Sequence, residues 1–257
     1  MSILPDLLLP LADDALVLGH RLSEWCGRAP TPEEDLALAN LALDQIGLAR
    51  ALYAVVAQET GQETGQGTGQ GTGQTEDTLA YFRDDRAFRN CLLVEQANGD
   101  FAQTIVRQFL FSAHADPFWR AACASVAPAL AAIAAKAEKE SAYHLRHAAA
   151  WLVRLGDGTE ESHARAQAAL TALWPCAEEA LTALDPVAVV AGILPDPAPI
   201  RAAWEATVTA TLSRATLERP TDAWPQTGGR AGRHTEAFGK MLAEMQSLAR
   251  AHPGAVW

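Results

Sequence analysis

Apolar and polar residues follow one another with the period of an α-helix along most of this chain. The clearest case is the stretch from Lys136 to Leu155, where one helical stripe is apolar apart from a single histidine. The stripe consists of Ile133, Ala137, His144, Ala148, Trp151 and Leu155. His144 lies at its centre, and Glu140 stands one turn before it. An imidazole or a carboxylate on the core side of a helix is costly unless it is paired or metal-bound. The stripe therefore predicts either a site or the remains of one.

The same spacing, with capping residues and prolines at helix ends, predicts long helices throughout. The start of the second predicted helix has the clearest signal, because Thr31 is a capping residue and is followed by Pro32 and two glutamates. Pro117 is expected to kink or split its helix. Helices are predicted over residues 11–26, 32–58, 77–89, 100–124, 128–156, 160–184, 199–217 and 235–250. No stretch has a convincing strand pattern, so the fold class is all-α, with long antiparallel helices.

We expect one domain over residues 1–257, with a core bundle at about 11–184 and additional C-terminal helices at about 199–250. Residues 59–74 are four tandem copies of a Gly-rich tetrapeptide. Such a segment cannot offset the entropy of ordering, which predicts a flexible surface loop; a partner-binding tether is the alternative. Residues 185–198 are interpreted as a proline-rich connection.

Composition excludes several classes of function. The chain has 257 residues, 49% of them hydrophobic, and a net charge of −11. This is enough for a substantial core, and it makes nucleic acid and anionic membranes poor partners. The four cysteines have no C-x-x-C spacing and are read as small core residues in a reducing compartment. The N-terminus lacks the basic region of a signal peptide, and the charge-free run 121–135 is too short to span a bilayer. These features predict a cytoplasmic protein.

Acids and a histidine on core faces of long helices suggest a ferritin-like di-iron bundle. Such bundles place a Glu on each of two helices and Glu-x-x-His on each of two others. Five positions of this chain partly match that set: Glu24, Asp44, Asp100, Glu140 and His144. Two ligands are missing, because Gly47 stands where the first motif needs His and Ser141 stands where the second needs Glu. The pattern is therefore a degenerate di-iron set, and no residue is assigned as catalytic or cofactor-binding.

Three interpretations of these polar positions stay open at this point. They could form a working iron site, or a satisfied buried network in which Arg107 replaces the metal charge, or some could face solvent or a partner. A separate Gly/Arg segment, residues 228–236, looks superficially like an anion-binding loop before a helix. It lacks the P-loop spacing, so docking on the bundle or on a partner is the alternative.

Beyond these patterns, the sequence resembles the C subunits of the bacterial multicomponent phenylacetyl-CoA monooxygenases, which are ring 1,2-epoxidases. The resemblance covers nearly the whole chain outside the 59–74 repeat. The matching stretches are L-S-E-W-C-G from Leu22, D-L-A-L-A-N-L-A-L-D from Asp35, E-D-T-L-A-Y-F-R-D-D-R from Glu76, L-L-V-E-Q-A-N-G-D-F-A from Leu92, K-E-S-A-Y-H-L-R-H from Lys139, R-L-G-D-G-T from Arg154, I-R-A-A-W-E-A from Ile200 and H-T-E-A-F-G-K-M-L-A-E-M-Q from His234.

The resemblance implies a ferritin-like fold and a role in aerobic phenylacetate catabolism. In that family the C subunit pairs with a related A subunit, which carries the di-iron centre and binds the acyl-CoA, and a reductase supplies electrons from NADPH. The A subunit has K-E-E-x-x-H where this chain has Lys139-Glu140-Ser141 and His144. The resemblance thus implies a structural subunit that binds no cofactor itself. Self-association is left open.

Two other functions are kept beside this one. An independent di-iron oxidase would use Glu24, Asp44, Asp100, Glu140 and His144 as an atypical ligand set. An acyl-CoA-binding accessory protein would use the Gly/Arg loop at 228–234 for a CoA phosphate.

Overall fold

The computed structural model describes residues 3–63, 74–221 and 224–255. In these residues the chain is all-helical and contains no strand, which confirms the predicted class. The helices are α1 (Leu4–Ser23), α2 (Pro32–Glu63), α3 (Glu76–Tyr81), α4 (Leu92–Glu95), α5 (Phe101–Ala122), α6 (Pro128–Gly156), α7 (Glu160–Ala180), α8 (Pro186–Val190), α9 (Pro197–Arg214) and α10 (Glu236–Ala251). Short 3-10 turns lie at Asp85–Ala87 and Gly229–Ala231.

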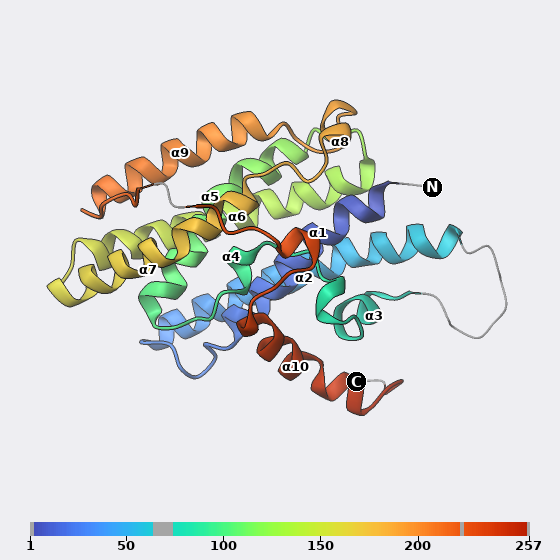
Figure 1. Ribbon diagram of the computed structural model, residues 1–257, viewed down its shortest axis with the longest axis horizontal. Helices are drawn as coiled ribbons and strands as arrows, with labels where there is room; N and C mark the ends of the chain where they lie inside the picture. The colour runs from blue at the N-terminus through green and yellow to red at the C-terminus, as the bar shows by residue number, and fades with distance from the viewer. Residues whose placement is uncertain (1–2, 64–73, 222–223, 256–257) are drawn as a thin grey trace.

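Two pairs of long helices form the centre of the molecule (Figure 1). A short turn joins α1 to α2, another joins α5 to α6, and α2 packs beside α6. Helices α7 and α9 pack on α5, while α3 and α4 lie against the first pair. The last helix, α10, reaches back to α3 and the first 3-10 turn. Short connections between long helices produce this antiparallel arrangement.

Local signals explain most helix ends. Thr159 caps α7 with a capping box, and Asp100 caps α5 by accepting a hydrogen bond from the Gln103 N–H at 2.9 Å. Pro128 opens α6 as predicted. Pro117 lies inside α5 and does not split the helix, so the expectation of a break there is wrong.

Four other boundaries differ from the prediction. Helix α1 begins at Leu4 rather than residue 11, because Pro5 suits a first helical turn. The predicted helix 77–89 stops at Tyr81 and continues only as a 3-10 turn. The 185–198 connection contains α8, whose cap Asp185 accepts hydrogen bonds from two backbone N–H groups. Helix α2 runs on to Glu63, so the first residues of the 59–74 repeat are helical; residues 64–73 lie outside the described residues.

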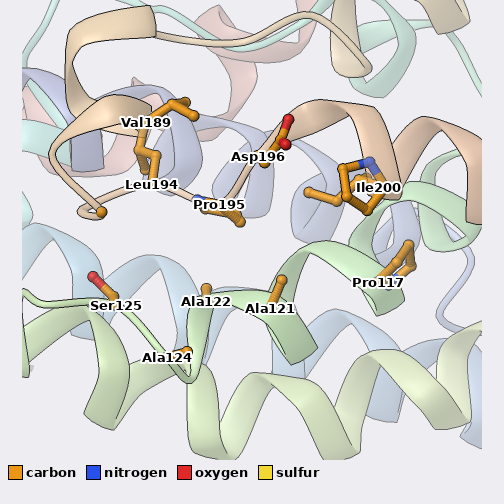
Figure 2. A pocket seen from close by; sticks show the side chains of 12 residues that line it. Pro117, Ala121, Ala122, Ala124, Ser125, Val189, Leu194, Pro195, Asp196 and Ile200 are labelled. Carbon is orange, nitrogen blue, oxygen red and sulfur yellow. The ribbon is translucent and has the colours of Figure 1, made fainter.

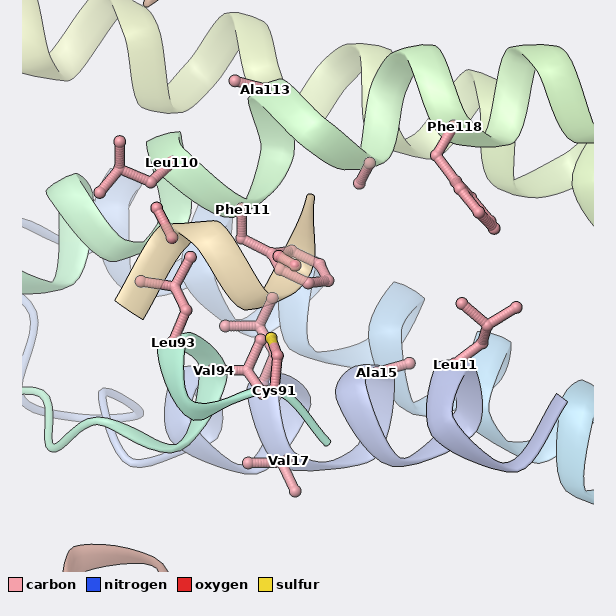
Figure 3. Close-up of a cluster of buried hydrophobic side chains, with 14 of the residues drawn as sticks. Leu11, Ala15, Val17, Cys91, Leu93, Val94, Leu110, Phe111, Ala113 and Phe118 are labelled. Carbon is pink, nitrogen blue, oxygen red and sulfur yellow. The ribbon is translucent and has the colours of Figure 1, made fainter. Parts of the chain in front are cut away.

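One continuous apolar core joins the helices. Figure 3 shows side chains of α1, α4 and α5 pointing into a common cluster, among them Leu11, Val94 and Phe111. Cys91 and Cys176 are buried in this core, but Cys26 and Cys123 are exposed, so the core interpretation fails for those two cysteines. None of the described helices is long and apolar enough to cross a membrane.

Candidate functional site: the contact between α2 and α6

His144 is buried where α6 meets α2. Its Nε2 atom lies 3.0 Å from Oδ2 of Asp44, and its Nδ1 atom lies 3.3 Å from the amide nitrogen of Gln45. One turn further along α6, Nε2 of His147 lies 2.9 Å from a carboxylate oxygen of Glu34. Two histidine–carboxylate pairs therefore join the same two helices.

Ser141 and Glu140, one turn before His144, have partners within their own helix. The Ser141 hydroxyl is buried and donates a hydrogen bond to the carbonyl of Ala137 in its own helix. Glu140 pairs with Lys136 of the same helix, with 3.1 Å between the ammonium nitrogen and the carboxylate. The Lys136 ammonium also passes close to Gly47, at 3.9 Å from where a Cβ of that residue would lie.

The structure does not bring Glu24 and Asp100 to this contact. Glu24 lies just beyond the end of α1, where it pairs with Arg21 at 2.8 Å and accepts a hydrogen bond from Asn98 at 2.8 Å. Asp100 caps α5 and faces Arg165 on α7 at 3.4 Å. Of the five sequence positions, only Asp44 and His144 are in direct contact.

Arg107 is completely buried on α5 and joins the Glu24 group rather than His144. Its guanidinium donates to the Gln96 carbonyl at 2.5 Å and to the Asn98 side-chain oxygen at 2.7 Å. Asn98 in turn donates to Glu24, so a hydrogen-bonded chain connects the two. Burial, followed by the nearby charge of Arg21, lowers the pKa of Arg107 to about 9.

The α2–α6 contact does not fit a di-iron centre. Such a centre needs several carboxylates to neutralise and bridge the metals, together with two imidazoles. Here each of the two carboxylates, Asp44 and Glu34, is paired with its own imidazole instead of sharing a metal, and the other side chain bound to His144, Gln45, is neutral. Among the residues that the structure describes, no group of three or more His, Cys, Asp and Glu side chains is arranged to hold a metal ion.

A second polar cluster, at the Gly/Arg loop, was not identified from the sequence. Glu179 of α7 is buried, and its carboxylate accepts hydrogen bonds from three backbone N–H groups. These belong to Gly228 at 2.8 Å, Arg230 at 3.1 Å and Leu92 at 2.8 Å. The loop does bind an anion, but that anion is a side chain of the same protein.

In the same region, the Arg230 guanidinium already has hydrogen-bond partners within the chain. It donates to Oδ2 of Asp14 at 2.6 Å and to the carbonyls of Pro10 and Arg89 at 3.1 and 2.8 Å. Asp14 also accepts the N–H of Cys91 at 2.7 Å. Burial raises the pKa of Asp14 despite the opposing charge of Arg230. The docking interpretation of this loop is thus confirmed for the bundle of the same chain.

Two further acids complete this polar layer. Asp13 accepts hydrogen bonds from Tyr53 at 2.5 Å and from Arg83, whose guanidinium also lies 4.0 Å above the Phe88 ring. Glu95 binds Nδ1 of His234 at 2.6 Å. Glu95, Asp14 and Glu179 together fasten residues 228–235 across the bundle, whereas Asp13 joins α1 to Tyr53 of α2 and to Arg83.

A sequence signal for these acids existed. Asp13 and Asp14 interrupt an otherwise apolar helix, L-L-L-P-L-A-D-D-A-L-V-L, and Glu95 follows L-L-V. Acids inside such runs are rarely buried without partners. The spacing alone does not reveal the partners of these acids. The partner of Asp14, for example, is Arg230, which lies more than two hundred residues further along the chain.

An apolar groove of about 390 Å³ lies between the end of α5 and the α8–α9 turn (Figure 2). Alanines of α5 line one side, and Leu194, Pro195 and Ile200 line the other. The acid at its edge, Asp196, is occupied as the cap of α9, where it accepts the Ala198 N–H at 2.9 Å. The groove therefore offers packing surface without chemically reactive groups.

Comparison with known proteins is consistent with this architecture. The sequence matches the phenylacetic acid catabolic protein family over residues 3–257. It is 46% identical over 251 residues to the C subunit of 1,2-phenylacetyl-CoA epoxidase from Escherichia coli (strain K12), a match that covers 97% of each chain. These findings confirm the resemblance seen in the sequence and its ferritin-like fold. The chain belongs to the phenylacetic acid catabolic protein family.

Proposed function

We propose that this chain is the C subunit of a 1,2-phenylacetyl-CoA epoxidase in phenylacetate catabolism. The support is the near-complete coverage of the corresponding Escherichia coli protein at 46% identity. At that level of identity, and with both chains covered almost end to end, the same position in the same assembly is the simplest expectation. The other components would be a related di-iron subunit and a reductase that uses NADPH.

Within that assembly the chain acts as a non-catalytic scaffold. The observation that carries this proposal is the direct pairing of Asp44 with His144 at the place where a metal ligand set would have to form. The carboxylate and imidazole satisfy each other, and the three remaining acids have their own partners: Glu24 and Asp100 at helix ends, and Glu140 in an ion pair with Lys136. A satisfied pair stabilises the contact between two helices and leaves no set of free donors for iron.

The test is an iron measurement on the chain purified alone and on the complex with the di-iron subunit of the same epoxidase. Iron should be substoichiometric on the chain alone and about two per catalytic subunit in the complex. A full di-iron complement on the isolated chain would refute the scaffold role and favour the independent oxidase.

Two matched variants separate a ligand from a structural residue. His144→Ala and His147→Ala each remove one histidine–carboxylate pair from the same helix contact. Both should destabilise the chain by about 2–4 kcal/mol, through lost packing and an unpaired acid. Neither should change the iron content of the assembled complex. A loss of iron with His144→Ala alone would identify His144 as a ligand.

The acyl-CoA-binding alternative is tested by titrating CoA into the isolated chain. Its phosphate would have to displace Glu179 from the loop N–H groups and Asp14 from Arg230. We therefore expect no binding that depends on Arg230. Saturable CoA binding that is abolished by Arg233→Ala, which alters an exposed side chain of the same loop, would support the alternative.

A further inference from the structure

The outer sides of α2 and α6 carry large apolar side chains that no described element covers. Leu36 is 67% exposed and Leu43 is 66% exposed. They are seven residues apart on α2, which places them two turns apart on one side of the helix. On α6, Tyr143 is 42% exposed. By contrast α1 is buried along most of its length, and α5 is covered by α7 and α9.

These side chains belong to one connected surface. The Tyr143 ring stacks on His147 with 6.3 Å between ring centres, and His147 binds Glu34, two residues before Leu36. At the other end, His144 binds Asp44, which directly follows Leu43. We call the surface formed by Leu36, Leu43, Lys136, Lys139, Tyr143 and Arg146 the α2–α6 face.

The two histidine–carboxylate pairs beneath this face hold its two helices together before any partner arrives. Both imidazoles bridge from α6 to α2. A preformed surface loses less conformational entropy on binding than a flexible one. The two histidine–carboxylate pairs, which do not form a metal site, therefore lie where they stiffen a docking surface.

The charge of the α2–α6 face differs from that of the chain as a whole. The net charge is −11 and only three lysines occur, yet Lys136 and Lys139 are both on this face, next to Arg146; because Lys136 is paired with Glu140 at 3.1 Å, the positive charge of the face comes from Lys139 and Arg146. The Lys136 side chain is 71% exposed. Cations beside an apolar stripe favour a partner surface that combines apolar and acidic side chains.

A second copy of this chain fits the α2–α6 face less well than a different chain. A two-fold contact would place the same residues on both sides, so that the cations of α6 would approach those of the second copy. The acidic surface elsewhere on a second copy could meet the face only in a head-to-tail contact, which forms rings or open filaments.

We propose that the α2–α6 face is where the catalytic di-iron subunit docks, through a helical surface of apolar and acidic residues. This inference rests on the proposed function, in which such a subunit is the partner. Leu36, Leu43 and Tyr143 form the apolar centre of the contact, and Lys139 and Arg146 form its basic edge.

The test measures the affinity of the full-length chain for that catalytic subunit. Leu43→Glu should weaken binding about 30-fold or more, as expected for a central contact residue. Because Leu43 is exposed, the urea unfolding midpoint of the Leu43→Glu variant should stay at the wild-type value. Leu248→Glu is the matched control, since Leu248 is a 56% exposed leucine on α10, away from the face. Lys139→Glu should slow association and reduce its dependence on salt.

Each alternative result is distinguishable. Wild-type binding that Leu43→Glu and Lys139→Glu leave unchanged would overturn the docking face while the proposed function stands. Failure of the wild-type chain to bind the catalytic subunit would overturn both. A wild-type homodimer that Leu43→Glu dissociates, with binding to the catalytic subunit unaffected, would assign the face to a second copy and overturn the inference.

Discussion

Replacing Glu179 with glutamine tests the reasoning about the C-terminal segment most directly. The Glu179 carboxylate receives N–H groups from two separate stretches of chain, Leu92 on one side and Gly228 and Arg230 on the other. Its oxygen Oε1 accepts the two loop N–H groups, and Oε2 accepts the third. Glutamine has nearly the same shape but only one acceptor oxygen, so one side must lose its hydrogen bond.

The magnitude follows from these three contacts. If the glutamine oxygen still accepts the hydrogen bonds from the N–H groups of Gly228 and Arg230, each of these bonds loses the strengthening by the negative charge, which is worth about 1 kcal/mol. The Leu92 N–H then faces an amide nitrogen, and a buried unpaired N–H costs about 1–3 kcal/mol. Together the substitution should lower the free energy of unfolding by about 3–5 kcal/mol. Glu179→Ala should cost at least as much, because it also leaves a cavity.

The assay is urea unfolding followed by far-UV circular dichroism, with Glu178→Gln as the matched control. Glu178 is the adjacent residue of α7 and pairs with Arg201 on the surface at 3.0 Å. An exposed ion pair contributes about 0–1 kcal/mol, so the control should unfold almost like the wild type. If Glu179→Gln loses less than 1 kcal/mol, or no more than Glu178→Gln, then the carboxylate does not fasten the loop and the reasoning fails.

Two further predictions concern the same C-terminal segment. Burial by itself would lower the pKa of His234, but the hydrogen bond and charge of Glu95 outweigh it and raise the pKa above its usual 6.5. The stability that His234 adds is therefore fully present below the unfolded pKa and is lost as the pH rises through the folded pKa. The difference in urea midpoint between wild type and His234→Gln should accordingly shrink as the pH is raised from about 5.5 to about 8.5. A difference that widens with pH would contradict this prediction. Gly229→Ala should lower the melting temperature, because its Cβ would lie 2.2 Å from the Asn90 carbonyl oxygen, whereas Gly239→Ala in α10 meets nothing within 4 Å and should gain about 0.5–1 kcal/mol. If calorimetry gives the same change in melting temperature for Gly229→Ala and Gly239→Ala, the packing argument for residue 229 is refuted.

Much of the helical framework could be predicted because its causes are local. Thr159 and Pro128 act on the first turn that follows them, and the apolar stripe around His144 repeats within one helix. The burial of His144 also follows from this local period. Where the local signals were weaker, as after Tyr81, the predicted helix was too long.

The helical period determines which side of a helix a residue occupies, but it does not determine the residue's partner. Glu24 shares a helix with buried leucines, yet it lies past the last turn of α1 and binds Asn98. Glu179 and the 228–230 loop each have an ordinary local pattern, and only the packing of α7 against the returning chain brings them together.

The sequence by itself therefore determined the helix class, most helix positions, the burial of His144 and the family. Only the tertiary structure decided that His144 closes on Asp44, that Asp14 meets Arg230 and that Leu36 and Leu43 stay uncovered. The physical reason is that periodicity reports a direction around one helix axis. The height along that axis, the distance to other helices and the competition among polar groups for partners arise only when all helices are packed.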